Sequence, residues 1–104
     1  MQTIISLHQS LIGGELQQSV NARELHTFLQ SKQRFSDWIK NRIEQYQFAQ
    51  DVDFSVIHSF MNDASAFGGK RKHTDYHLTL DMAKELSMVE RNAKGRQARR
   101  YFID

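Results

Sequence analysis

The last thirty residues constrain the fold most, because residues 75–104 join a strand pattern to a long helix pattern in the segment DYHLTLDMAKELSMVERNAKGRQARRYFID. Tyr76, Leu78 and Leu80 alternate with other residues, which indicates a strand. Apolar residues then fall within a narrow arc at ~100° per residue: Met82, Leu86, Val89 and Ala93. We therefore expect one long C-terminal helix, capped by Thr79 or Asp81, whose arc faces the core.

The second half of this expected helix is basic and ends in apolar residues. It contains Arg91, Lys94, Arg96, Arg99 and Arg100, with no acidic residue from Arg91 until Asp104. Such arginines can grip phosphates or carboxylates, but near a helix C-terminus they also interact favourably with the helix dipole. Both interpretations stay open. The apolar residues Tyr101, Phe102 and Ile103 cover both sides of the helix end and favour an interface there.

Gly95 interrupts the same helix pattern. Glycine is about 1 kcal/mol less favourable than alanine inside a helix. Gly95 therefore indicates either the close approach of another backbone or a tolerated surface site.

Composition limits the class of protein. A chain of 104 residues with 39% hydrophobic and 25% charged residues is expected to form a single domain, residues 1–104. The absence of Cys excludes disulfides, thiolate zinc sites and Cys nucleophiles. No apolar run approaches the roughly 20 residues of a membrane helix, and the start lacks a signal-peptide pattern, so we expect a cytoplasmic protein with no membrane partner. A net charge of +2 is too small to indicate nucleic-acid binding by itself.

The first half of the chain predicts a small hairpin followed by two amphipathic helices. The apolar segment 3–7, the Gly13-Gly14 turn signal and the alternation over 16–20 predict the hairpin. Asn21 is placed to cap a helix, with Glu24 three residues later as in a capping box. That helix should end after Gln30 and bury Ala22, Leu25 and Leu29. Ser36 should cap a second helix, residues 37–48, with the apolar stripe Trp38, Ile39, Ile43 and Tyr46.

Two further strands should flank a long basic loop. Residues 53–58 alternate like a strand, and residues 76–80 do the same. The segment between them, 59–74, is long for a hairpin connection and contains Lys70, Arg71 and Lys72, which makes it a candidate functional loop. The predicted fold class is therefore α+β: a hairpin, a helix-turn-helix pair, a β-hairpin wing with a long basic loop, and a long C-terminal helix, in a winged-helix-like order.

This order allows a DNA-binding interpretation. The second helix would enter the major groove with Lys40, Asn41, Arg42 and Gln45, and the basic loop would contact phosphates. The structural interpretation is favoured on pattern alone, because two consecutive amphipathic helices and a solvated Lys/Arg cluster occur in many domains.

Catalytic and metal sites are not indicated. The pair His73 and His77 lies at a loop-to-strand junction, where four-residue spacing gives no helical face for a metal. Gly68-Gly69-Lys70 lacks the other residues of a phosphate loop, since Ala64 replaces its first Gly and Arg71 its Ser or Thr. His26 is expected to be a partly buried helix residue. We therefore expect no enzyme, no cofactor and no metal.

Four motifs in order carry a resemblance to a known family: VNARELHTFL, FSDWIKNRIEQY, DVDFSV and DYHLTLDMAKELSMVERNAKGRQARRYF. Together they resemble the AntA/AntB family of phage antirepressors, which is related in broad type to the KilA-N and Bro-N domains. This sequence reads GGKRK where such proteins often have Gly-Arg-Pro before the tyrosine strand. Many members continue into a C-terminal region, so we expect the chain to be either a truncated or a naturally short member.

The resemblance implies a non-enzymatic switch in a bacterial host: the protein binds a phage repressor and so releases lytic genes. We hypothesise that the last helix and the basic loop make this contact, through Lys70, Arg71, Lys72, Arg96, Arg99, Arg100, Tyr101 and Phe102. Direct DNA binding by the winged-helix-like surface is the alternative function. A homo-oligomer formed through Tyr101, Phe102 and Ile103 is a third hypothesis.

Overall fold

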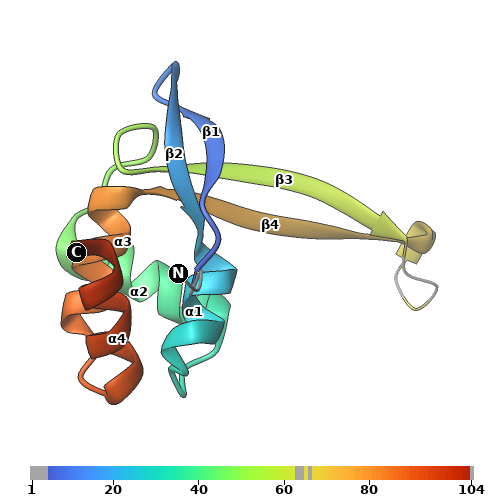
Figure 1. Cartoon of the computed structure of the whole chain (residues 1–104). Helices are drawn as coiled ribbons and strands as arrows, with labels where there is room; N and C mark the ends of the chain where they lie inside the picture. The colour runs from blue at the N-terminus through green and yellow to red at the C-terminus, as the bar shows by residue number, and fades with distance from the viewer. Residues whose placement is uncertain (1–4, 63–64, 66, 104) are drawn as a thin grey trace.

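The computed structural model describes residues 5–62, 65 and 67–103. Four strands form one antiparallel sheet in the order β1-β2-β4-β3, and four α-helices gather on one side of it (Figure 1). The strands are β1 (His8–Ile12), β2 (Glu15–Asn21), β3 (Phe54–Asn62) and β4 (Lys70–Thr79). The helices are α1 (Ala22–Leu29), α2 (Phe35–Tyr46), α3 (Leu80–Val89) and α4 (Ala93–Ile103), and a short 3-10 turn, Phe67–Gly69, precedes β4. The predicted α+β class is confirmed.

The N-terminal hairpin forms around Gly13 and Gly14, as predicted. Both glycines have positive φ, 65° and 82°, as a type I′ two-residue hairpin turn requires. The turn fixes the register, with Ile12 opposite Glu15, so the first strand is His8–Ile12 and not the predicted segment 3–7. Thr3 and Ile4 lie outside the described residues. Ile5 is buried without belonging to the strand.

The two predicted hairpins share one sheet. β2 pairs with β4 over three residues, and the central pair is Val20 opposite Leu78. Both side chains are completely buried, so this short ladder lies directly over the core. The burial of these two branched apolar side chains explains why β2 and β4, and with them the two hairpins, pair at this point.

The β3–β4 hairpin is much longer than the sequence indicates. Its ladder runs from Phe54 opposite Leu78 to Asn62 opposite Lys70, so the prediction of a loop over 59–74 is wrong. The basic residues Lys70, Arg71 and Lys72 belong to β4. The outer part of this hairpin projects away from the helices, and we call residues 58–62 and 70–74 the arm (Figure 1). None of the arm residues whose side chains are described is buried, which accounts for the lack of a clear alternation in its sequence.

Helix α1 begins where its cap was predicted. Asn21 Oδ1 accepts hydrogen bonds from the backbone amides of Arg23 and Glu24, at 2.9 and 3.1 Å. Leu25 and Leu29 are completely buried, and Gln30 ends the helix in the left-handed region with φ 55°. The predicted start, face and end of this helix are therefore confirmed.

Helix α2 begins before its predicted cap. Arg34 occupies the N-cap position without a side-chain cap, so Ser36 lies inside the first turn and the cap prediction is wrong. Tertiary contacts at Phe35 account for the earlier start: its ring packs against Trp38 and Tyr76, and the guanidinium of Arg23 lies 4.3 Å from its centre. Trp38 and Ile39 are buried, whereas Tyr46 at the end of the stripe is 40% exposed.

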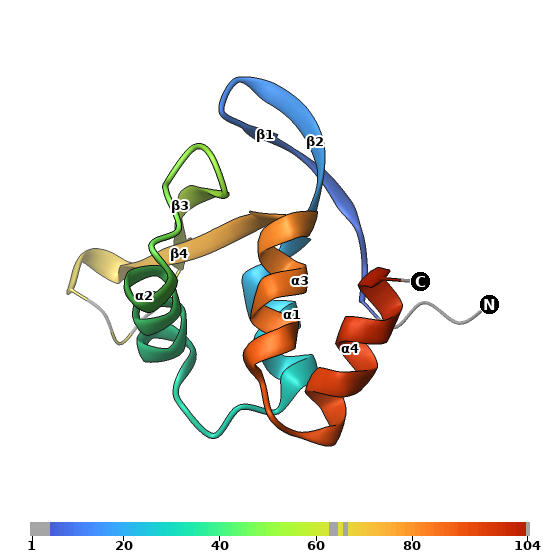
Figure 2. The same ribbon diagram turned by 90° about the vertical axis from the view of Figure 1, so that its left-hand side faces the viewer.

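The predicted long C-terminal helix is two helices. Thr79 caps α3 by accepting from Met82 N at 3.2 Å, and Met82 and Leu86 are buried, as predicted. The chain then turns at Glu90, whose backbone is extended, and α4 packs back beside α3 (Figure 2). Ala93 is consequently exposed, so its placement in the core-facing arc was wrong.

Tertiary contacts hold the turn between α3 and α4. Asn92 donates its side-chain amide to Leu29 O at 2.9 Å and accepts from Gly95 N at 2.7 Å, which caps α4. Gly95 is buried, and a β-carbon there would collide with the carbonyl of Glu90. Of the two interpretations of Gly95 that the sequence left open, the structure supports the close approach of another backbone segment. We call residues 90–92 the elbow.

The core lies between the sheet and the helices. Its buried apolar members are Ile5, Val20, Ala22, Leu25, Leu29, Trp38, Ile39, Phe54, Leu78, Met82, Ala83, Leu86 and Ala98. Every helix and three of the strands contribute to it. Within the described ranges, no helix has the length and apolar character needed to cross a membrane.

Candidate partner-binding surface

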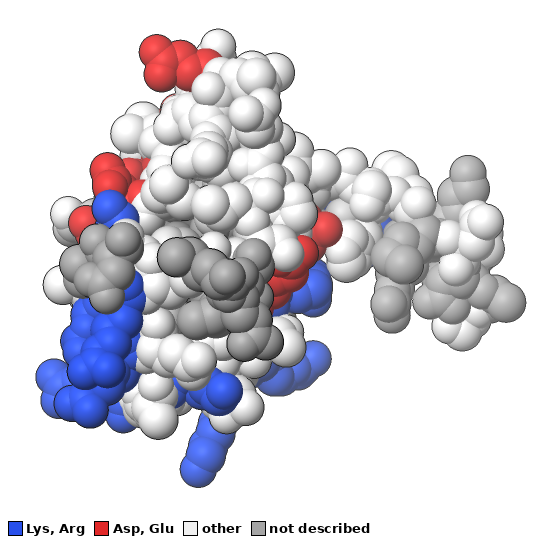
Figure 3. Space-filling model, viewed as in Figure 1, with Lys and Arg blue, Asp and Glu red and all other residues white. Residues whose placement is uncertain are grey.

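The arginines of the elbow and α4 form an exposed basic surface. Arg91, Arg96 and Arg100 are exposed and Arg99 is half-buried. No acidic residue in the described part of the chain forms an ion pair with any of these four. Figure 3 shows Lys and Arg gathered over the region where Figure 1 draws α4, with acidic residues above them. Among the described residues, no ion pair neutralises the positive charge of this surface.

Part of this surface is concave. A pocket of about 460 Å³ at the elbow is lined by Met88, Glu90, Arg91, Asn92, Arg96 and Arg99, among others. We call it the elbow pocket. The Glu90 side chain is only 11% exposed, and its Oε1 lies 3.2 Å from Arg42 Nη2 and 3.4 Å from Trp38 Nε1 of α2. Because Arg42 neutralises this carboxylate, the pocket keeps a net positive charge from its arginines.

The apolar end of α4 packs onto its own chain. Tyr101 and Phe102 are partly buried against the core, and Tyr101 Oη donates to the carbonyl of Ile5 at 3.2 Å. The chain itself therefore covers much of these two rings, which removes the argument that a partner must cover them. Both residues directly follow Arg99 and Arg100 in the sequence of α4. The side chain of Ile103 lies outside the described set.

The arm and α4 do not form one surface. In Figures 1 and 2, which differ by 90°, α4 and the far end of the arm lie on opposite sides of the molecule. Lys72 is exposed on the arm. The structure therefore separates Lys70, Arg71 and Lys72 from Arg96, Arg99 and Arg100, whereas the sequence-based hypothesis assigned all six to one contact.

The predicted DNA-contacting residues of α2 differ in their surroundings. Lys40, Asn41 and Gln45 are exposed. Arg42 instead reaches Glu90, and its Nη1 donates to Gln45 Oε1 at 3.3 Å. Its Nε is buried and has no hydrogen-bond partner among the residues that the structure describes. Arg42 thus connects α2 to the elbow, and three of the four residues remain directed to solvent.

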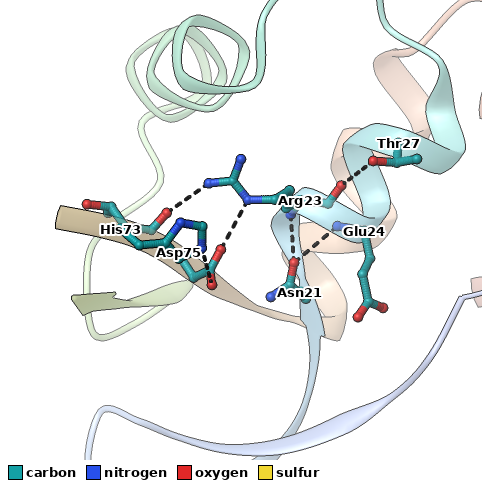
Figure 4. A network of polar contacts seen from close by, with 7 residues as sticks. Asn21, Arg23, Glu24, Thr27, His73 and Asp75 are labelled. Atoms are coloured by element: carbon teal, nitrogen blue, oxygen red, sulfur yellow. Dashed lines mark hydrogen bonds and ion pairs between the residues drawn. The ribbon is translucent and has the colours of Figure 1, made fainter. Parts of the chain in front are cut away.

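A polar network between α1 and β4 was not predicted. Arg23 Nε donates to Asp75 Oδ1 at 3.3 Å and its Nη2 to Thr74 O at 3.2 Å, and His73 Nε2 lies 3.1 Å from Asp75 Oδ2 (Figure 4). The network borders a shallow pocket of about 580 Å³. More than fifty residues separate Arg23 from Asp75, so no local sequence signal could reveal it. It ties the base of the arm to α1.

Elsewhere in the described part of the chain, the clusters of polar side chains are small. Ser10 Oγ lies 2.8 Å from both Ser19 Oγ and His77 Nδ1, but no carboxylate contacts His77 within the described residues. The same residues contain no group of three or more His, Asp or Glu side chains placed to hold a metal. His26 is partly buried, with Nε2 2.7 Å from Gln33 O and its ring against Phe35 and Trp38. The prediction for His26 is confirmed.

Comparison with known proteins places the chain in a family. A family model described as AntA/AntB antirepressor matches residues 20–92. The match includes α1, α2, β3, β4, α3 and the elbow, while the basic residues of α4 lie outside it. Searches of curated proteins and of solved structures gave no significant match. Since the matched residues make up more than half of its length, the chain belongs to the AntA/AntB antirepressor family.

Proposed function

We propose that this protein is a phage or prophage antirepressor that binds a transcriptional repressor in the cytoplasm of the bacterial host. By removing the repressor from its operator, it would allow the lytic genes to be transcribed. The observation that carries the proposal is the family match over residues 20–92. The antirepressor family consists of regulatory proteins, and the activity we propose is binding without catalysis.

The physical requirement is a difference in affinity. An antirepressor shifts the repressor away from DNA only if it binds the DNA-free state more tightly than the operator-bound state. A contact surface that overlaps or distorts the DNA-binding face of the repressor meets this requirement. The DNA-binding face of a repressor carries positive charge, so it would repel a basic surface of the antirepressor. Such a basic surface can instead contact another, acidic part of the repressor.

We assign the repressor contact to α4. Its arginines Arg96, Arg99 and Arg100 have no acidic partner in the described residues, and the partly buried Tyr101 and Phe102 follow them in the same helix. Arginine and aromatic residues are the commonest anchors of protein interfaces. Lys70, Arg71 and Lys72 on the arm would contact a different partner, since they lie on the opposite side of the molecule (Figures 1 and 2).

Direct DNA binding is the second candidate function. The exposure of Lys40, Asn41 and Gln45 on α2 supports it, as does the basic arm, which could follow a phosphate backbone in a winged-helix-like manner. A complex of this kind would weaken steeply as the salt concentration rises, because counterions are released from DNA on binding.

A reporter experiment tests the proposed function. The repressor, its operator fused to a reporter gene and this protein are expressed together in the bacterial host. We expect the wild type to raise reporter expression and the double variant Arg96→Ala with Arg100→Ala to lose most of this effect. Lys32→Ala with Arg34→Ala removes the same number of charges from exposed sites between α1 and α2 and should act like the wild type. Unchanged reporter expression with the wild type, together with an intact repressor, would refute the function.

A further inference from the structure

We propose that the elbow pocket binds an acidic segment of a protein partner, with carboxylates on Arg91, Arg96 and Arg99 and an adjacent apolar side chain on Met88. This inference rests on the proposed function, in which that partner is the repressor. It specifies the chemistry of the partner, and it adds Arg91 and Met88 to the contact.

The charge of the pocket selects a carboxylate. Three arginines line it, and no acidic side chain of the described chain pairs with them. The one acidic residue in the lining, Glu90, is held by Arg42. A guanidinium binds a carboxylate through two parallel hydrogen bonds, so a partner with two or three closely spaced Asp or Glu residues complements this arrangement.

The neighbouring face of α3 determines in which orientation a partner segment would bind. Asp81, Glu85 and Met88 are all exposed and, at intervals of four and three residues, lie on one side of the helix. Met88 is 53% exposed and also borders the pocket. From α3 to the elbow the surface therefore changes from acidic to apolar to basic. The complementary partner segment presents a basic, then an apolar, then an acidic group.

This pattern favours a protein over a nucleic acid. A duplex carries one phosphate charge per ~1.7 Å of its axis and needs a continuous basic surface. Asp81 and Glu85 interrupt such a surface on α3, and the half-buried Lys84 offsets only one of their two charges. Exposed Met beside Arg is instead typical of protein interfaces, where both residue types are enriched.

The pocket is held in shape before any partner binds. Trp38 and Arg42 fix Glu90, and the Asn92 side chain fixes the elbow to the last turn of α1. Gly95 allows α4 to approach the backbone of Glu90 closely. A site whose backbone is already ordered loses less conformational entropy on binding, which favours even a short segment.

Titration of the full chain, labelled with 15N, with a synthetic peptide tests the inference. The peptide carries a Lys, a Leu and a Glu-Glu pair in that order, and its control has the Lys and Glu residues exchanged. We expect the first peptide to shift the amide signals of Met88, Arg91, Arg96 and Arg99. Arg96→Ala with Arg99→Ala should weaken this binding roughly tenfold or more, whereas Lys32→Ala with Arg34→Ala should not.

Three results would overturn the inference. The first is the absence of shifts at the elbow up to millimolar peptide, and the second is equal binding of the exchanged-charge peptide. The third is displacement of the peptide by a short DNA duplex with shifts at the same residues, which would mark a phosphate site.

The reporter experiment separates the two proposals: if Arg96→Ala with Arg99→Ala still relieves repression, only the pocket assignment fails. If the wild type does not relieve repression, the proposed function fails, whatever the peptide does.

Discussion

Gly95 occupies a helical position where a β-carbon would collide with the carbonyl of Glu90. Alanine is usually about 1 kcal/mol more favourable than glycine inside a helix. At this position we expect the reverse, since the overpacked Gly95→Ala variant should lose about 1–3 kcal/mol of unfolding free energy. Urea unfolding measures the change. Gln97→Ala, at an exposed position of α4, is the control and should change stability little. A Gly95→Ala protein as stable as the wild type would contradict the geometry of the elbow.

Asn21 caps α1 with two hydrogen bonds to backbone amides. Its replacement by alanine leaves both amides without this acceptor and should lower the unfolding free energy by about 1 kcal/mol. Asn21→Asp keeps an acceptor and adds a charge that the helix dipole favours, so it should unfold at the wild-type urea concentration or higher. Equal losses in the two variants would show that the oxygen acceptor of residue 21 does not stabilise the helix.

At this scale the sequence predicts what depends on near neighbours. Asn21 and Thr79 could be identified as caps because their partners lie two or three residues away. The contacts of Arg42 with Glu90 and of Arg23 with Asp75 could not, since 48 and 52 residues separate the partners. Arg42 was consequently assigned to a DNA contact, although the fold directs its guanidinium to the elbow.

The elbow depends on its connection to α2. In Arg42→Met, the Glu90 carboxylate stays largely buried without its charged partner, which should cost about 1–3 kcal/mol. The added change Glu90→Gln removes the uncompensated charge, so the double variant should regain part of the loss. Urea unfolding of both single variants and the double variant gives the coupling energy, with Lys40→Ala as the exposed control on the same helix. Strictly additive losses would mean that Arg42 and Glu90 do not interact.

Element types were predictable, and element ends were less so. The division between α3 and α4 carries no proline and no glycine at the break itself, because tertiary bonds of Glu90 and Asn92 create it. The full length of β3 and β4 could not be predicted from the sequence, because their outer halves, residues 58–62 and 70–74, extend beyond the helices (Figure 1). The basic residues 70–72 were therefore assigned to a loop.

On the scale of the whole molecule, α4 and the arm face opposite sides, so charge removal from each should affect different partners (Figures 1 and 2). Arg96→Ala with Arg99→Ala should reduce repressor binding roughly tenfold or more. Lys40→Ala with Lys72→Ala removes the same charge from α2 and the arm and should leave repressor binding within about twofold, since exposed charges far from an interface contribute little. Surface plasmon resonance with immobilised repressor measures both. A larger loss of repressor binding in the second double variant than in the first would place the repressor contact on the side of α2 and the arm.

The central claim is that the protein acts on a repressor and not on DNA, and an electrophoretic mobility shift of the operator duplex tests it most directly. The duplex is run with the repressor alone, with this protein alone, and with both, at physiological salt. We predict that this protein abolishes the shift caused by the repressor and leaves the free duplex unshifted. A shift by this protein alone, or a repressor–operator complex that persists in its presence, would contradict the proposed function.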